Sequence, residues 1–152
     1  MIKIDIIAVS RVRKGPYADL IKDYSDRIRW NLTIHEIESR YSDPQKAQTD
    51  EQEKILKLID THAFTIVLDE RGDGLRSLDF AKTIERFQNN GENHFQFIIG
   101  GADGLLDDIR DKANLLLSFG QQTWPHVLAR VMLLEQIYRA QQIMCGHPYH
   151  RE

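Results

Sequence analysis

The last eight residues of the chain hold its densest group of side chains that can do chemistry. They read Cys-Gly-His-Pro-Tyr-His-Arg-Glu and begin at Cys145. Histidine can move protons near neutral pH, tyrosine can stack on a nucleobase, and arginine can bind phosphate. Zinc binding by Cys145, His147 and His150 is disfavoured, because the chain has no second cysteine and no His-Glu-x-x-His motif. We therefore expect no metal site, and a frayed terminus is the alternative to a functional tail.

Three glycine-bearing loops are the second candidate for chemistry. They span residues 69–76, 100–104 and 119–126, and each lies at the end of an apolar run. Glycine permits positive φ and lets the backbone approach a ligand closely. Ordinary turns would explain any one of these loops, but three loops at one edge of a sheet predict a pocket lined by main chain.

The second loop, Gly-Gly-Ala-Asp-Gly, argues against a phosphate-bearing nucleotide. It matches neither the dinucleotide fingerprint nor the P-loop, and Asp103 would place negative charge near a helix start. A ligand with a cationic centre and no phosphates fits better, and S-adenosylmethionine is one of several with that character. Main-chain groups of the third loop could match the edges of an adenine. His126, after Pro125, is either a base or a helix-start residue, and we favour the second interpretation.

The elements that must position these loops alternate between strand and helix. Apolar runs predict strands at residues 2–9, 32–37, 64–68, 95–99 and 115–119. Helical spacing predicts helices from Pro16, from Pro44 to near Asp60, from an N-cap at Ser77, around 106–109 and over 127–144. Such alternation predicts an α/β fold, a parallel sheet with helices on both faces, and the last three runs read as its central strands. We expect one domain over residues 1–152, with ligands at the carboxyl ends of the strands.

Composition limits the compartment and the partners. The chain has 152 residues, one cysteine and a net charge of -3. No segment resembles a signal peptide or reaches membrane-spanning length, so we expect a soluble cytoplasmic protein that does not bind a membrane. An RNA site must then be a local basic patch, either Arg11, Arg13 and Lys14 or Arg130, Arg139 and Arg151, and a solvated face is the alternative for both.

The last predicted helix carries apolar residues around much of its circumference, including Val127, Val131, Leu134 and Tyr138. A helix with so wide an apolar arc is buried on more than one side. Two interpretations stay open: a central core helix, or a helix covered by a second copy of the chain through two-fold symmetry.

Three segments resemble the ribosomal RNA large-subunit methyltransferase H family. They are Ile-Ile-Gly-Gly-Ala-Asp-Gly at 98–104, Trp-Pro-His at 124–126 followed by Arg130 and Glu-Gln-Ile-Tyr-Arg-Ala at 135–140, and the terminal His-Pro-Tyr-His-Arg-Glu. The resemblance covers essentially the whole chain. Because this family belongs to the SPOUT class, the resemblance implies an α/β-knot fold with a C-terminal trefoil knot, and a homodimer.

The resemblance also implies an enzyme and its site. The reaction is transfer of a methyl group from S-adenosylmethionine to N3 of a pseudouridine in large-subunit ribosomal RNA, on the assembled ribosome. The cofactor contacts carried over are Leu68, Gly100, Phe119, Gly120, Gln121, Gln122, Thr123 and Trp124. For catalysis we expect His150 with Tyr149 and Arg151, and Arg139 to orient them or hold phosphate. The alternatives are a non-catalytic RNA- or ribosome-binding dimer and a small-molecule methyltransferase.

Overall fold

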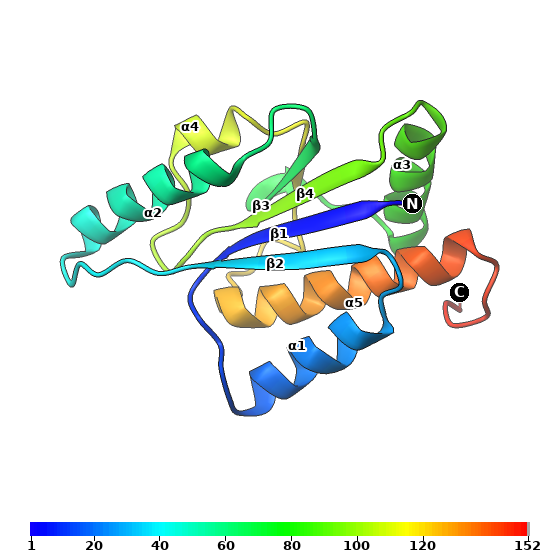
Figure 1. Ribbon diagram of the computed structural model, residues 1–152, viewed down its shortest axis with the longest axis horizontal. Helices are drawn as coiled ribbons and strands as arrows, with labels where there is room; N and C mark the ends of the chain where they lie inside the picture. The colour runs from blue at the N-terminus through cyan, green and yellow to red at the C-terminus, as the bar shows by residue number, and fades with distance from the viewer. Residues whose placement is uncertain (152) are drawn as a thin grey trace.

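The computed structural model describes residues 1–151, in which strands and helices alternate along the chain (Figure 1). The strands are β1 (Lys3–Val9), β2 (Asn31–Ile37), β3 (Phe64–Asp73), β4 (His94–Ile99) and β5 (Leu115–Leu117). The helices are α1 (Pro16–Arg27), α2 (Pro44–Leu58), α3 (Ser77–Asn89), α4 (Asp107–Arg110) and α5 (His126–Met144). Proline opens α1 and α2, where its missing N–H costs nothing, and the Asp43 carboxylate caps α2 by accepting from the Lys46 amide.

The five strands form one parallel sheet in the order β2-β1-β4-β3-β5. The predicted parallel α/β sheet is therefore confirmed, but the prediction that residues 115–119 form a central strand is wrong. β5 lies at the edge, where it pairs only with β3, and its Leu115 and Leu116 are half-buried. An apolar run alone does not separate an edge strand from a central one, because the helices packed on either face also bury side chains of an edge strand.

Helices cover both faces of the sheet, as predicted. One face packs Ile4, Ile6 and Phe97 against α1, α3 and α5, and the opposite face packs Ile7 and Ile98 against α2 and α4. In Figure 1, α2 and α4 lie above the sheet and α1 and α5 lie below it. The trefoil knot stays a prediction. None of the helices in residues 1–151 has the length and apolar character needed to cross a bilayer.

Helix α5 is a core helix, which was one of the two interpretations of its apolar arc. It packs between α1 and α3, and its central residues Leu133, Leu134 and Ile137 are fully buried. Val127, Leu128 and Met132 stay only half-buried. Coverage of that remaining side by a second copy stays a prediction.

Two local predictions are wrong. β3 continues through residues 69–73, which were expected to form a loop, because Asp73 pairs with Leu117 across a bulge. Gly72 makes this pairing possible, since a Cβ atom there would lie 2.5 Å from the Leu116 carbonyl oxygen. Ser77 is not the N-cap of α3: Arg76 holds that position, and the Ser77 hydroxyl instead donates to Gln136 of α5 at 2.7 Å.

Candidate active site

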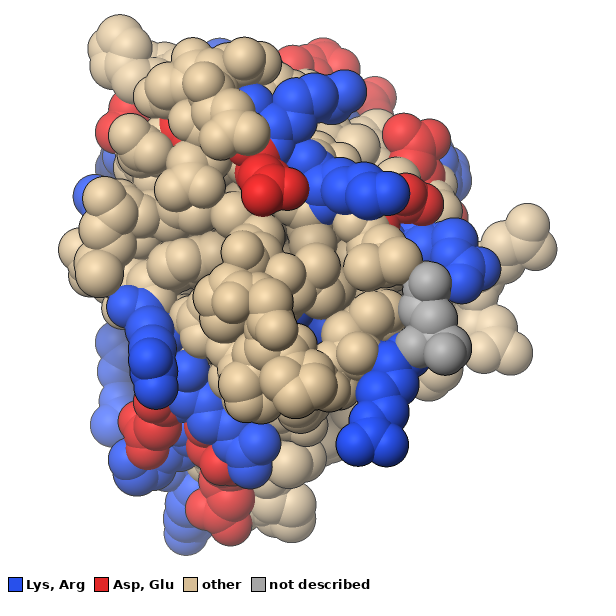
Figure 2. All heavy atoms as spheres, turned by 90° about the vertical axis from the view of Figure 1, so that its right-hand side faces the viewer, with Lys and Arg blue, Asp and Glu red and all other residues tan. Residues whose placement is uncertain are grey.

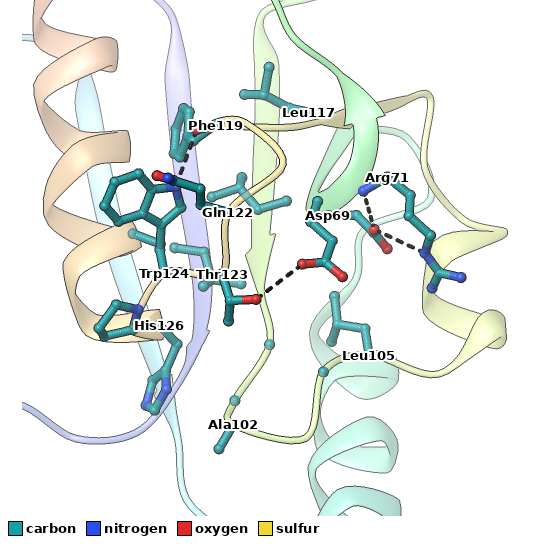
Figure 3. A pocket seen from close by; sticks show the side chains of 18 of the residues that line it. Asp69, Arg71, Ala102, Leu105, Leu117, Phe119, Gln122, Thr123, Trp124 and His126 are labelled. Atoms are coloured by element: carbon teal, nitrogen blue, oxygen red, sulfur yellow. Dashed lines mark hydrogen bonds and ion pairs between the residues drawn. The ribbon is translucent and has the colours of Figure 1, made fainter.

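A cavity of about 720 Å³ lies at the carboxyl ends of β3, β4 and β5 (Figure 3). This is the sheet edge at which the three glycine-bearing loops were expected to meet. Seven of the eight predicted cofactor residues line the cavity: Leu68, Gly100, Phe119, Gly120, Gln122, Thr123 and Trp124. The eighth, Gln121, is exposed and lies outside the lining.

The glycine loop after β4 is held from α2. Gly101 and Gly104 form a bridge, and Gly104 adopts a φ of +75° that favours glycine. The Gln48 side-chain amide donates to the Asp103 carbonyl at 2.9 Å, and the buried Gln52 side chain accepts from the Leu106 amide at 3.0 Å. Sequence reasoning missed both glutamines. Helical spacing could have identified them, because Gln48 and Gln52 lie on the same face of α2 as the buried Ile55.

The loop after β5 is closed by its own side chains. The buried Ser118 hydroxyl accepts from the Gly120 amide at 3.1 Å and lies 2.9 Å from the Gly120 carbonyl oxygen. The Trp124 indole N–H donates to the Phe119 carbonyl at 3.2 Å, as the dashed line in Figure 3 shows. Gly120 has a φ of +112°, which favours glycine. The loop thus lies against the cavity in a conformation that its own residues fix.

Among the charged side chains that line the cavity, carboxylates outnumber arginines. Asp69 pairs with Arg110 and accepts from the Arg71 amide. Burial favours a higher pKa for Asp69, but these hydrogen bonds and the arginine charges outweigh burial and lower its pKa. Glu70 and Asp103 also line the cavity, and neither pairs with a cation within residues 1–151. Glu70 instead accepts from the Thr123 hydroxyl at 3.5 Å.

The start of α5 is fixed to the ends of β1 and β2. His126 is the first residue of α5, as we favoured, and its Nε2 lies 2.7 Å from the Ser10 hydroxyl. Ser10 has a φ of +93°, which is unusual for a residue with a side chain. Burial, together with the nearby Arg130 charge, lowers the pKa of His126. The His126 imidazole is therefore mainly neutral, and its contact with Ser10 connects the start of α5 to the end of β1.

Arg130 does not belong to a basic surface patch, which corrects our prediction. Its side chain is 1% exposed, and it donates to the Glu36 carboxylate at 2.7 Å and to the Ser10 carbonyl at 2.8 Å. Arg130 was predicted to lie on the surface because isolated cations are rarely buried. A guanidinium that pairs with a carboxylate and with backbone carbonyls can nevertheless be buried in the protein interior. Arg11, Arg13 and Lys14 are exposed, and Arg11 lies 3.4 Å from Glu38.

The C-terminal tail folds back on the end of α5, so the frayed-terminus alternative is wrong (Figure 1). The Tyr149 hydroxyl donates to the Glu135 carboxylate at 2.7 Å, and its ring lies edge-on to Tyr138 with the centroids 4.8 Å apart. Arg139 bridges this group, because it pairs with Glu135 at 2.7 Å and its Nη1 lies 3.1 Å from Nδ1 of His150. Tyr149 and Arg139 thus contact Glu135, and His150 contacts Arg139, whereas Arg151 is exposed.

Within one chain, this tail cluster does not line the cofactor cavity. Ala129 of α5 lines the cavity, and Arg139 follows ten residues later on the same helix. At 1.5 Å per residue these positions are about 15 Å apart along the helix. The sequence did not predict this separation, because the order of residues along a chain does not fix the distance between a loop and a tail.

The pKa of Tyr149 gives a direct test of the docked tail. Burial and the Glu135 carboxylate raise the pKa of Tyr149 to about 12. Because the pKa of Tyr149 is raised, docking of Tyr149 should stabilise the fold fully below about pH 10, the ordinary pKa of tyrosine in an unfolded chain. That stabilisation should be lost as the pH rises through about 12. Burial favours a higher pKa for Glu135, but hydrogen bonds from Arg139 and Tyr149 outweigh burial and lower the pKa. The stabilisation that the ionised Glu135 provides is therefore lost as the pH falls through this lowered pKa.

The measurement is a phenolate absorbance titration of wild type and of Tyr149→Phe. The difference between the two curves should show one tyrosine ionising near pH 12. In Glu135→Gln that ionisation should move toward the ordinary value of about 10, because the neighbouring negative charge is removed. A Tyr149 that ionises near pH 10 in wild type would contradict the docked arrangement.

Comparison with known proteins identifies the family. The family model described as predicted SPOUT methyltransferase matches residues 2–150. The ribosomal RNA large subunit methyltransferase H of Rhodospirillum centenum is 45% identical over 147 residues, which cover 96% of this chain and 97% of the relative. The protein of the same name from Zymomonas mobilis is 40% identical over 150 residues, covering 99% of both chains.

Solved structures share the fold at low sequence identity. A Haemophilus influenzae protein described as belonging to a methylase family superimposes with a TM-score of 0.60 at 12% identity, covering 100% of this chain and 72% of that one. A Legionella pneumophila protein described as a methyltransferase in complex with S-adenosylmethionine superimposes with a TM-score of 0.51 at 11% identity, covering 91% of this chain and 66% of that one. The family model and the nearly full-length relatives above show that this chain belongs to the SPOUT methyltransferases, within the ribosomal RNA large subunit methyltransferase H family.

Proposed function

We propose that this chain transfers a methyl group from S-adenosylmethionine to N3 of a pseudouridine in large-subunit ribosomal RNA, on the assembled ribosome. The observation that carries the proposal is the glycine-bearing, carboxylate-rich cavity at the ends of β3, β4 and β5. The names of the relatives, which specify large-subunit ribosomal RNA, support the substrate class.

The cavity fits this methyl donor. Its volume of about 720 Å³ lies within the range of about 300–1,000 Å³ that is usual for sites of small ligands. Gly100 leaves room at the loop after β4, since a Cβ atom there would lie 2.8 Å from the Leu105 side chain. Glu70 and Asp103 favour a cationic ligand over a phosphate-bearing one. We assign cofactor binding to the seven predicted residues that line the cavity: Leu68, Gly100, Phe119, Gly120, Gln122, Thr123 and Trp124. The bound donor supplies an electrophilic methyl group.

The tail supplies the groups that handle the acceptor. In our proposal His150 accepts the N3 proton of the base at Nδ1, and the bound acceptor displaces the Arg139 Nη1 donor that occupies this lone pair in the structure. Tyr149, with a pKa of about 12, stays protonated at neutral pH and acts by stacking and hydrogen bonding. Arg151 is exposed and available for phosphate. Orientation of acceptor and donor supplies the larger part of the rate enhancement.

The distance between tail and cavity favours a homodimer. Arg139, which contacts His150, lies about 15 Å along α5 from Ala129 of the cavity, so His150 cannot complete the cavity of its own chain without moving. In a two-fold dimer the tail of a second copy can reach it, and the half-buried Val127 and Leu128 at the start of α5 supply an apolar surface for such contact. We therefore propose that each active site combines the cavity of one copy with the tail of the other.

The charge distribution favours the whole ribosome over naked RNA as substrate. The net charge is -3, and Arg130 is buried. On the face shown in Figure 2, Lys and Arg side chains are interspersed with Asp and Glu. Non-specific attraction to RNA phosphates is therefore weak, and a composite ribosomal surface must supply the remaining contacts.

Mass spectrometry of ribosomal RNA tests the proposal. RNA from cells lacking this protein should contain an unmethylated pseudouridine where wild-type RNA contains its N3-methyl form, and whole ribosomes should restore methylation in vitro far better than an isolated stem-loop. A non-catalytic RNA- or ribosome-binding dimer would leave the modification unchanged. That alternative gives no reason for a glycine-lined cavity, and it predicts no thermal stabilisation by S-adenosylhomocysteine, whereas the enzyme should be stabilised.

A further inference from the structure

A second cavity adjoins the cofactor cavity. Its volume is about 430 Å³, and it lies between the start of α3, the middle of α5 and the end of β5. The two cavities share the residues Leu117, Phe119 and Gly120. A group bound in the second cavity would thus lie directly beside the loop to which we assign cofactor binding.

One face of α5 runs from the cofactor cavity past the second cavity to the tail. Ala129 lines the first cavity, Met132 and Gln136 line the second, and Arg139 contacts His150. Their spacing of three, four and three residues places these four side chains on one side of the helix. Along α5, the second cavity therefore lies between Ala129 of the cofactor cavity and Arg139.

The second cavity combines apolar walls with one oriented amide. Phe80, Met132 and Phe119 provide apolar surface that suits a flat ring. The Gln136 amide is fixed at both ends, because its Oε1 accepts from Ser77 at 2.7 Å and its Nε2 donates to Glu135 at 3.0 Å. A side-chain amide has two N–H donors and two oxygen lone pairs. One N–H and one lone pair of Gln136 thus have no partner within residues 1–151.

We propose that this second cavity binds the acceptor pseudouridine base and that Gln136 recognises its N1–H and O2 edge. The amide oxygen accepts from N1–H and the amide nitrogen donates to O2, while N3 on the other side of O2 stays unpaired. Uridine cannot make this pair, because its N1 carries the ribose. Gln136 is therefore a specificity-determining residue that selects pseudouridine over uridine, and this inference rests on the proposed function.

The test uses the methionine methyl groups as reporters. The chain has three methionines, of which Met132 lines the cavity and Met1 is 88% exposed. Protein with isotope-labelled methionine methyls, saturated with S-adenosylhomocysteine, is titrated with pseudouridine monophosphate and then with uridine monophosphate. We expect the Met132 signal, assigned by Met132→Leu, to shift while the Met1 signal stays, and pseudouridine monophosphate to bind about tenfold more tightly than the uridine compound.

Two variants of Gln136 separate recognition from packing. Gln136→Leu removes both hydrogen-bonding groups, and Gln136→Glu keeps the shape but removes the donor to O2. Gln136→Leu should lose the preference for pseudouridine, whereas Gln136→Glu should keep it because its carboxylate still accepts from N1–H. Both variants should raise KM for the acceptor, while S-adenosylhomocysteine affinity and kcat change little.

The outcomes distinguish this inference from the proposed function. If the N3-methyl modification depends on this protein but Met132 does not respond and Gln136→Leu keeps the preference, the second cavity is not the acceptor site and the proposed function stands. A Met132 shift that follows protein dilution instead of ligand would also overturn the inference, because it would show that a second copy fills the cavity. If Met132 responds selectively but the modification persists in cells lacking the protein, the cavity inference stands and the proposed function fails.

Discussion

Gly100→Val is expected to abolish S-adenosylhomocysteine binding while the chain still folds. A Cβ atom at this position would lie 2.8 Å from Cγ of Leu105 and 3.2 Å from the Gly104 carbonyl carbon. Valine adds two methyl groups to that Cβ, and Gly100 and Leu105 both line the cavity, so the strain falls on the cavity wall. We expect the Kd to rise by a factor of about one hundred or more, which corresponds to about 2.7 kcal/mol.

Calorimetric titration gives the Kd, and thermal unfolding with and without ligand gives an independent measurement. Wild type at a ligand concentration of about one hundred times Kd gains about 2.7 kcal/mol of stability, which Gly100→Val should lose. Gly100→Ala is the graded control. Its single added carbon meets mainly the flexible Leu105 side chain, so binding should weaken less. A folded Gly100→Val protein with an unchanged Kd would place the cofactor site elsewhere.

His150→Ala is expected to reduce methyl transfer strongly and to leave cofactor affinity nearly intact. His150 lies against Arg139 at the far end of α5 and does not line the cofactor cavity. If it accepts the N3 proton, its loss should lower kcat about 100- to 10,000-fold, the usual contribution of general base catalysis. The Kd for S-adenosylhomocysteine should stay within about twofold, because no cavity contact is removed.

Single-turnover assays on ribosomes measure the effect, and His62→Ala is the matched control. His62 is exposed between α2 and β3, away from the tail and both cavities. This control should keep wild-type turnover and wild-type cofactor affinity. Unchanged turnover in His150→Ala would remove this residue from the mechanism, whereas loss of cofactor binding would show that the tail shapes the cavity.

Several features of this protein depend on contacts between segments far apart in the chain. Asp5 in β1 is buried because His35 of β2 and His94 of β4 bind its carboxylate at 2.9 and 2.5 Å. Burial favours a higher pKa for Asp5, but these two histidines and the Lys3 charge lower it. No local pattern predicts such a cluster, because its three members meet only when the strands pair.

What the sequence determined by itself is the set of elements and the place of the candidate cavity. Apolar periodicity predicted the strands and helices, and glycine loops at three strand ends predicted a main-chain pocket, because parallel strands end at the same edge of a sheet. The tertiary structure alone decided which cations are buried and which groups meet. Pairing with Glu36 placed Arg130 inside, and α5 separated the tail from the cavity. These outcomes depend on packing between distant segments, which residue spacing along one chain does not encode.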